Sequence, residues 1–254
     1  MNLESHINYI MIPELNAQVK NLSTFEKVKE VCIKVKENRY RSVCTRNDFL
    51  GIVRNNIMDN TFTRTVVIGY PDTKLSADLT SALLGASSKE NKYEEMKIAI
   101  LLGATEFEYA LNQKDIHDKN SEKITDEIKG AINIADGKVI KFIIETGLLT
   151  NYEISYITKL ICMCVSISFL NKILSVGLHK VKNNVIIKTS SGYVNNISGA
   201  KVENIRLIKN TIGKIDLTIE ASVGITTKKQ ALEFIDAGAS LIGITEDLKD
   251  EDQA

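Results

Sequence analysis

The sequence predicts a (β/α)8 barrel that forms a single domain over residues 1–254. Short apolar runs of β-forming residues alternate with longer stretches of helical periodicity from one end of the chain to the other. Eight such alternations fit into 254 residues, which is a common length for one barrel. No linker rich in Pro or Ser divides the chain, which holds only 2 Pro residues. A doubly wound open sheet is the alternative that this pattern leaves open.

The strand candidates are bounded by polar residues or glycine and are rich in Val and Ile. Such runs are typical of parallel strands that are buried on both faces. In chain order, the eight candidates are Tyr9–Ile12, Ser42–Cys44, Thr65–Ile68, Glu106–Leu111, Val139–Ile144, Val185–Lys188, Leu217–Ala221 and Ser240–Ile244.

The intervening stretches have the periodicity of amphipathic helices, in which apolar residues recur at i, i+3, i+4 and i+7. The clearest are Phe25–Val35, Val202–Asn210 and Lys228–Ala237. Gly238 follows the last of these as a helix stop, because glycine readily adopts the left-handed conformation that ends many helices. Another apolar run, Leu160–Leu170, is too short to cross a membrane and predicts a buried helix face.

The charge balance argues against two classes of partner. The chain has 32 basic and 32 acidic residues, so it lacks the net positive field of most proteins that bind nucleic acid or anionic membranes. The first ten residues, MNLESHINYI, include an early Glu and have no apolar core, so they do not predict a signal peptide. The acidic residues at 247–254 predict a frayed tail.

The four cysteines do not have the spacing of a metal site. Cys162 and Cys164 form C-x-C, Cys32 and Cys44 lie far from them, and no histidine is near. A zinc site normally needs paired ligands at C-x2–4-C spacing. We therefore expect four reduced, buried thiols, a cytoplasmic location and no bound metal.

Charged residues within or at the ends of the apolar strands are the candidates for a site, because chemistry in a barrel sits where the strands end. A buried charge is costly unless it is paired, so such residues concentrate at functional sites. There are five of them: Glu108, Lys141, Glu145, Lys188 and Glu220. A single strand-end charge is often only a solvated residue, but five together point to chemistry.

Several segments resemble the deoxyribose-phosphate aldolase family. VIIKTSSGY (residues 185–193), followed by GAKVENIRLIKNTIG (199–213), resembles the sixth-strand motif K-T-S-T-G. In register with it are TVVIGYP (65–71), GATEFEYALN (103–112), KVIKFIIETGLLT (138–150) and IEASVGITTKKQALEFIDAGASLIGI (219–244). The resemblance covers residues 7 to 247 and implies the barrel fold of a class I aldolase, a lyase that forms a Schiff base.

The resemblance assigns roles to the charged residues. Lys188 takes the place of the lysine that forms the Schiff base, which needs a neutral amine in a pocket poor in water. Glu108 stands where the family has an Asp that relays protons, and Lys141 stands at the family's lysine on the fifth strand. Cys44 matches a family cysteine near the substrate. The other substrate contacts that the resemblance implies are Thr189, Ser190, Gly192, Gly224, Gly243 and Thr245.

The sequence departs from the family at the site itself. The seventh-strand pattern K-x-A-G-G-I-R is here E-A-S-V-G-I-T, so the second lysine is Glu220. A carboxylate near Lys188 raises the pKa of its amine, whereas an ammonium lowers it. The first strand has Asn8, Tyr9 and Ile10 where the family usually has Asp-His-Thr.

The phosphate-binding turns of the family are altered as well. Val223 replaces a glycine of the Gly-Gly turn, and its Cβ hinders the close approach of an anion to the backbone. Glu246 and Asp247 follow the eighth strand and are expected to bring negative charge to the place of the phosphate. We therefore expect weak phosphate recognition.

Three functions follow from the sequence. The first is a divergent aldolase that cleaves or forms a carbon–carbon bond through a Schiff base on Lys188, without a cofactor. The second is an enzyme that uses Glu108 and Glu220 as a carboxylate pair on another substrate. The third is an inactive barrel that serves as a binding or assembly module. The expected partner is a small aldehyde or sugar-type substrate, and a homodimer is compatible with the sequence.

Overall fold

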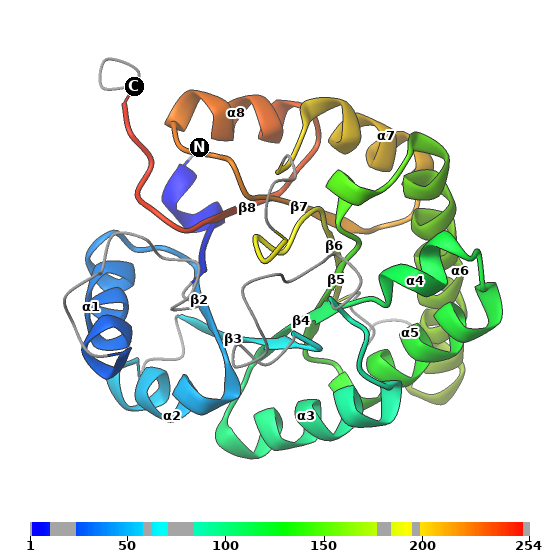
Figure 1. Ribbon diagram of the computed structural model, residues 1–254, viewed down its shortest axis with the longest axis horizontal. Coiled ribbons are helices and arrows are strands. Elements are labelled where there is room, and N and C mark those ends of the chain that lie inside the picture. Colours follow the sequence, from blue (N-terminus) through cyan, green and yellow to red (C-terminus); the bar gives the residue numbers. More distant parts are fainter. Residues whose placement is uncertain are drawn as a thin grey trace.

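Eight parallel strands form a closed barrel in the computed structural model, which describes residues 2–10, 24–57, 62–70, 84–176, 184–194 and 199–250. Each strand pairs with the next along the chain, and β8 closes the ring against β1 (Figure 1). The strands are β1 (Ile7–Ile10), β2 (Ser42–Thr45), β3 (Thr63–Ile68), β4 (Glu106–Ala110), β5 (Val139–Ile143), β6 (Val185–Lys188), β7 (Thr218–Ser222) and β8 (Leu241–Ile244).

The (β/α)8 barrel is therefore confirmed, and the open sheet is excluded. Every predicted strand is present, and its bounds agree with the prediction to within two residues. β1 begins at Ile7 rather than Tyr9 and β3 at Thr63 rather than Thr65, while residues 11 and 12 lie outside the described part of the chain.

Helices surround the barrel on the outside (Figure 1). They are α1 (Thr24–Glu37), α2 (Asn47–Asn56), α3 (Lys89–Leu102), α4 (Gln113–His117), α5 (Ser121–Ala135), α6 (Asn151–Val176), α7 (Val202–Ile212) and α8 (Lys228–Asp236), with short 3-10 helices η1 (Leu3–His6) and η3 (Thr146–Leu148). The predicted stripe of α1 is buried, including Val28, Cys32 and Val35. Gly238 follows α8 with φ 115°, as its predicted role as a helix stop requires.

The apolar run Leu160–Leu170 lies within α6, and it has the buried face that the sequence predicts. Ile161 and Cys164 are buried, whereas Met163, Ile167 and Leu170 are exposed. The run is apolar on all sides of the helix, and the barrel with the adjoining helices covers only one side. No helix in the described part of the chain is long and apolar enough to span a membrane.

All four cysteines are buried and free, as predicted. Residues 247–250 have contacts that a frayed tail would lack. The carboxylate of Asp247 lies 2.9 Å from Lys34 Nζ and accepts a hydrogen bond from the Tyr40 hydroxyl, while Lys249 bridges to Thr227. Residues 251–254 lie outside the described part.

Candidate active site

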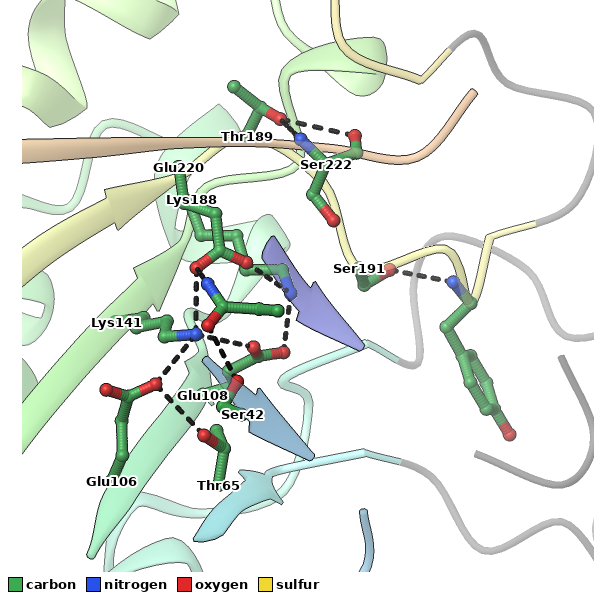
Figure 2. Close-up of polar contacts among 12 residues, drawn as sticks. Ser42, Thr65, Glu106, Glu108, Lys141, Lys188, Thr189, Ser191, Glu220 and Ser222 are labelled. Atoms are coloured by element: carbon green, nitrogen blue, oxygen red, sulfur yellow. Dashed lines mark hydrogen bonds and ion pairs between the residues drawn. The ribbon is translucent and has the colours of Figure 1, made fainter. Parts of the chain in front are cut away.

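The candidate site is a set of charged side chains inside the barrel. Glu106 and Glu108 lie two residues apart on β4. The next strands, β5, β6 and β7, contribute Lys141, Lys188 and Glu220. The register places Glu108 beside Lys141 and Lys188 beside Glu220. All five side chains have no exposed surface, and they converge in the barrel interior (Figure 2).

Two lysines and two carboxylates alternate around the centre of this set. Lys188 Nζ donates to Glu108 Oε2 at 2.6 Å and lies 3.1 Å from Glu220 Oε1. Lys141 Nζ lies 2.8 Å from Glu220 Oε2 and donates to Glu108 Oε1 at 3.1 Å (Figure 2). Each lysine therefore bridges both carboxylates, so Glu108 and Glu220 are neutralised by lysines rather than left as the free carboxylate pair of the second sequence hypothesis.

Arg41 and Glu106 extend this network towards the amino-terminal end of the strands. Glu106 lies 2.8 Å from Lys141 Nζ and 2.5 Å from Arg41 Nη2, and it accepts from the Thr65 hydroxyl. The Arg41 side chain is 24% exposed, so only this end of the network reaches the solvent. Three cations face three carboxylates, so the network has no net charge. This pairing offsets the free-energy cost of burying the charged groups.

The network sets the protonation of its members. Burial alone would lower the pKa of Lys188, but the carboxylates of Glu108 and Glu220 outweigh it and raise the pKa above its ordinary value. Burial would raise the pKa of Glu108, but Lys188 and Lys141 lower it to about 2. Lys188 is thus held as an ammonium ion at neutral pH, as the replacement of a lysine by Glu220 predicts.

Asn8 on β1 completes the surroundings of Glu220. Its amide donates to Glu220 Oε2 at 2.7 Å, and its oxygen accepts from Ser42 at 2.6 Å and from Arg41 at 2.8 Å. An aspartate at position 8 would place a second carboxylate against Glu220. The amide is therefore matched to the carboxylate that it contacts.

An apolar layer lies on the carboxyl-terminal side of the charged network. It consists of buried side chains near the strand ends, Leu84, and two tyrosines that follow β3 and β6: Ile10, Cys44, Val67, Tyr70, Leu84, Ala110, Ile143 and Tyr193. The rings of Tyr70 and Tyr193 meet edge to face at 5.4 Å between centroids. Cys44 belongs to this layer, where burial and the nearby Glu108 raise the pKa of its thiol.

The segment after β6 is fixed by neighbouring strands. Thr189 exchanges hydrogen bonds with the main chain of Ser222, donating to its oxygen at 3.4 Å and accepting from its N–H at 3.0 Å (Figure 2). The hydroxyl of Ser190 is buried and has no hydrogen-bond partner among the described residues. The structure thus places Thr189 and Ser190 beside Lys188, where the resemblance put substrate contacts.

The turn after β7 has an unusual backbone. Val223 has φ 76°, a left-handed conformation that β-branched residues rarely adopt, and Gly224 follows with φ 79°. Gly199 packs so closely on the Val223 carbonyl that a Cβ at position 199 would collide with it. On β8, Gly243 leaves no room for a Cβ against Glu220 and Ser222, and Thr245 follows that strand.

The position of the Asp247 carboxylate differs from the expectation from the sequence. Asp247 was expected to bring negative charge to the place of the phosphate, but its carboxylate points to Lys34 and Tyr40 on the α1 side. Glu246, which was expected there as well, is half-buried.

Sequence reasoning found five of the buried charges but missed several partners. It omitted Glu106, Arg41 and Asn8 from the site. Glu106 lies two residues before Glu108, so period-2 alternation places both on the same face of β4 and is a signal that would have found it. Among the described residues, no group of His, Cys, Asp and Glu is arranged to hold a metal ion.

The fold and the site define a closed (β/α)8 barrel protein with a cluster of lysines and carboxylates buried in its interior. No protein-family model matches the chain. Among curated proteins, the deoxyribose-phosphate aldolase of Clostridium tetani is 31% identical over 232 residues, which cover 91% of this chain and 92% of that protein. The deoxyribose-phosphate aldolase of Dictyoglomus turgidum is 32% identical over 223 residues, which cover 88% and 86%.

Solved structures share the fold. The aldolase QR15 has a TM-score of 0.75 at 22% identity, with 96% of this chain and 92% of that one covered. The deoxyribose phosphate aldolase of Aeropyrum pernix, described as tetrameric, has a TM-score of 0.70 at 19% identity, with 96% and 86% covered. This chain belongs to the deoxyribose-phosphate aldolase family.

Proposed function

We propose that this protein is an aldolase that cleaves or forms a carbon–carbon bond through a Schiff base on Lys188. The proposal rests on one observation above all. The amine of Lys188 is buried at the end of β6, 2.6 Å from Glu108, in the Lys-Thr-Ser segment that resembles the family's motif. The substrate is a small aldehyde or a deoxy sugar of the kind named by the relatives.

The first step in this mechanism prepares the amine. An ammonium group cannot add to a carbonyl, so Lys188 must lose a proton before it reacts. Glu108 is the nearer acceptor, because its Oε2 already receives a hydrogen bond from Lys188 at 2.6 Å, whereas Glu220 Oε1 lies at 3.1 Å. The low pKa of Glu108 makes this transfer unfavourable at neutral pH, so the reaction is expected to accelerate as the pH rises towards the pKa of Lys188.

The neutral amine then adds to the substrate carbonyl, and loss of water gives an iminium ion. In the cleavage direction, a base removes the proton of the hydroxyl group on the β-carbon, and the carbon–carbon bond between the α- and β-carbons breaks. The electron pair moves into the iminium and leaves an enamine, while the β-carbon departs as an aldehyde. Protonation of the enamine and hydrolysis release the second aldehyde and regenerate the amine. Glu108 is the group proposed to carry these protons.

Lys141 and Glu220 act by electrostatics in this proposal. Lys141 bridges Glu108 and Glu220, so it keeps Glu108 ionised and ready to accept a proton. Glu220 stabilises the positive charge of the lysine and of the iminium that replaces it. The strained turn at Val223 lacks the first glycine of the family's Gly-Gly phosphate turn, so we propose weak binding of the phosphate group.

The test is reductive trapping. The wild-type protein is incubated with acetaldehyde or deoxyribose 5-phosphate and borohydride from pH 7 to pH 10, and the adduct is located by mass spectrometry. We expect an adduct on Lys188 whose rate of formation rises with pH, and none in Lys188→Met. Lys141→Met serves as the matched control, because it also removes a buried lysine of the network. A folded wild-type protein that forms no adduct at any pH, or forms it elsewhere, would refute the proposal.

A further inference from the structure

Ser191 is the meeting point of three segments at the carboxyl end of the barrel. Its N–H donates to Glu145 Oε2 at 3.0 Å, and its hydroxyl donates to the same oxygen. The hydroxyl also accepts from the N–H of Tyr193 at 2.9 Å (Figure 2), and its carbonyl accepts from the Tyr70 hydroxyl at 3.3 Å. Ser191 thereby joins the end of β5 to the tyrosines that follow β3 and β6.

Glu145 is buried although none of the described contacts pairs it with a cation. Its side chain has no exposed surface, and its second oxygen, Oε1, has no hydrogen-bond partner among the described residues. The residue also has φ 57° and ψ 62°, a left-handed conformation that costs a non-glycine residue free energy. Such strain persists where the surroundings fix the residue, and it concentrates at functional sites.

The main chain around Lys188 is held on the same side. Ile144 N–H donates to the Lys188 carbonyl at 3.1 Å, and Thr146 N–H donates to the Thr189 carbonyl at 2.8 Å. These two bonds continue the pairing of β5 and β6 past the strand ends, and Glu145 lies between their donors. The side chain of Glu145 therefore holds Ser191, which follows Lys188 and Thr189 in the same segment, by hydrogen bonds.

We propose that Glu145 is a positioning residue of the site: through Ser191 it fixes both the segment that carries Lys188 and the tyrosine pair beside it. The role needs only an oxygen that accepts two hydrogen bonds from Ser191, not a negative charge. Burial raises the pKa of Glu145, which agrees with a carboxyl group that works as an acceptor without needing its charge. An amide oxygen therefore satisfies the same requirement.

The positional part of the proposal is tested without any activity, by amide hydrogen exchange followed by NMR. In Glu145→Leu the amides of residues 191 and 193 should exchange about tenfold faster, which corresponds to the loss of one hydrogen bond of about 1.4 kcal/mol. In Glu145→Gln they should keep the protection of the wild type. In Ser191→Ala only the amide of residue 193 should exchange faster. This variant replaces Glu145→Leu in the test if Glu145→Leu does not fold. Ser166→Ala on α6 is the control, because among the described residues its hydroxyl bonds only to Cys162, within the same helix.

The catalytic part rests on the proposed function and uses the trapping of Lys188 with acetaldehyde and borohydride. Misplacing a reacting group by about 1 Å can cost about a hundredfold in rate, so we expect Glu145→Leu to trap 10- to 100-fold more slowly. Glu145→Gln should trap at the wild-type rate, with an unchanged pH profile. If the wild type traps nothing, the proposed function fails, while the exchange rates still decide whether Glu145 fixes Ser191.

Two results would overturn the proposal. One is unchanged exchange at residues 191 and 193 in a folded Glu145→Leu protein, or at residue 193 in Ser191→Ala. The other is a Glu145→Gln protein as impaired as Glu145→Leu in both assays, since that would show that the charge of Glu145 matters rather than its acceptor oxygen.

Discussion

Replacing Glu220 by Gln is the sharpest test of how the barrel interior controls Lys188. The substitution keeps the shape of the side chain and an oxygen that can accept from Asn8, but it removes the charge that lies 3.1 Å from Lys188 Nζ and 2.8 Å from Lys141 Nζ. Because that carboxylate raises the pKa of Lys188, its removal should lower this pKa and release the free amine at lower pH.

The geometry gives the size of the effect. Two unit charges 3.1 Å apart interact by about 5 kcal/mol at an effective dielectric constant of about 20, which sets an upper limit of about 4 pKa units. Glu108 stays in place and the site relaxes, so we expect the fall that one neighbouring charge usually causes, about 1–3 units. Trapping at pH 7 should then be about 10- to 1000-fold faster. Three cations are left facing two carboxylates, so the free energy of unfolding should fall by about 3–5 kcal/mol.

The assay is the pH profile of adduct formation on Lys188, measured beside urea unfolding. Glu106→Gln is the matched control, because Glu106 contacts Lys141 and Arg41 but makes no ion pair with Lys188. We expect the control to lose similar stability while its profile shifts by less than about one unit. A folded Glu220→Gln protein with the wild-type profile, or an equal shift in both variants, would refute the reasoning.

Three other outcomes are expected. The pKa of Glu108 is about 2 in the folded protein instead of 4.5, so the stability that its carboxylate contributes is complete above pH 4.5 and is lost as the pH falls towards 2. Urea unfolding between pH 5 and pH 2.5 should therefore show a free energy of unfolding that falls by on the order of 1.4 kcal/mol per pH unit. A Glu108→Gln protein with the same pH dependence would contradict this expectation. Val223→Gly should relieve the left-handed strain and stabilise the protein by up to about 1 kcal/mol, measured as a rise of about 2–4 °C in Tm, whereas a fall would show that the valine side chain is needed there. Lys92 is buried 2.5 Å from Glu127, so Lys92→Met should cost about 3–5 kcal/mol in urea unfolding, and adding Glu127→Gln should recover part of it.

The sequence predicted the barrel because the strands are buried on both faces, which produces short apolar runs that local composition reveals. Charged residues inside such runs stand out for the same reason, and Lys141, Lys188 and Glu220 were found in this way. The partners of these residues were harder to predict. Which carboxylate meets which lysine depends on the stagger of neighbouring strands around the barrel, and that stagger is not encoded in any local window.

One error has a local cause. Asp247 was assigned to the phosphate region because it follows β8, but the chain after that strand turns towards α1, where Lys34 and Tyr40 bind its carboxylate. The run Leu160–Leu170 has the predicted buried face, but which side of the helix is buried could not be predicted, because a uniformly apolar run carries no periodicity to tell the inner side of a helix from the outer.

The hydrogen bond between Asn8 and Glu220 makes these two positions interdependent in evolution and in engineering. The family resemblance implies Asp and Lys there, so each residue of this chain suits the other and would be poorly matched to the family's partner. Introducing Lys at position 220 alone would leave an ammonium group beside two other lysines, with Asn8 offering no compensating charge. The effects of the two substitutions are therefore expected to be strongly non-additive. We therefore expect a protein with both substitutions, Asn8→Asp and Glu220→Lys, to be more stable than one with Glu220→Lys alone.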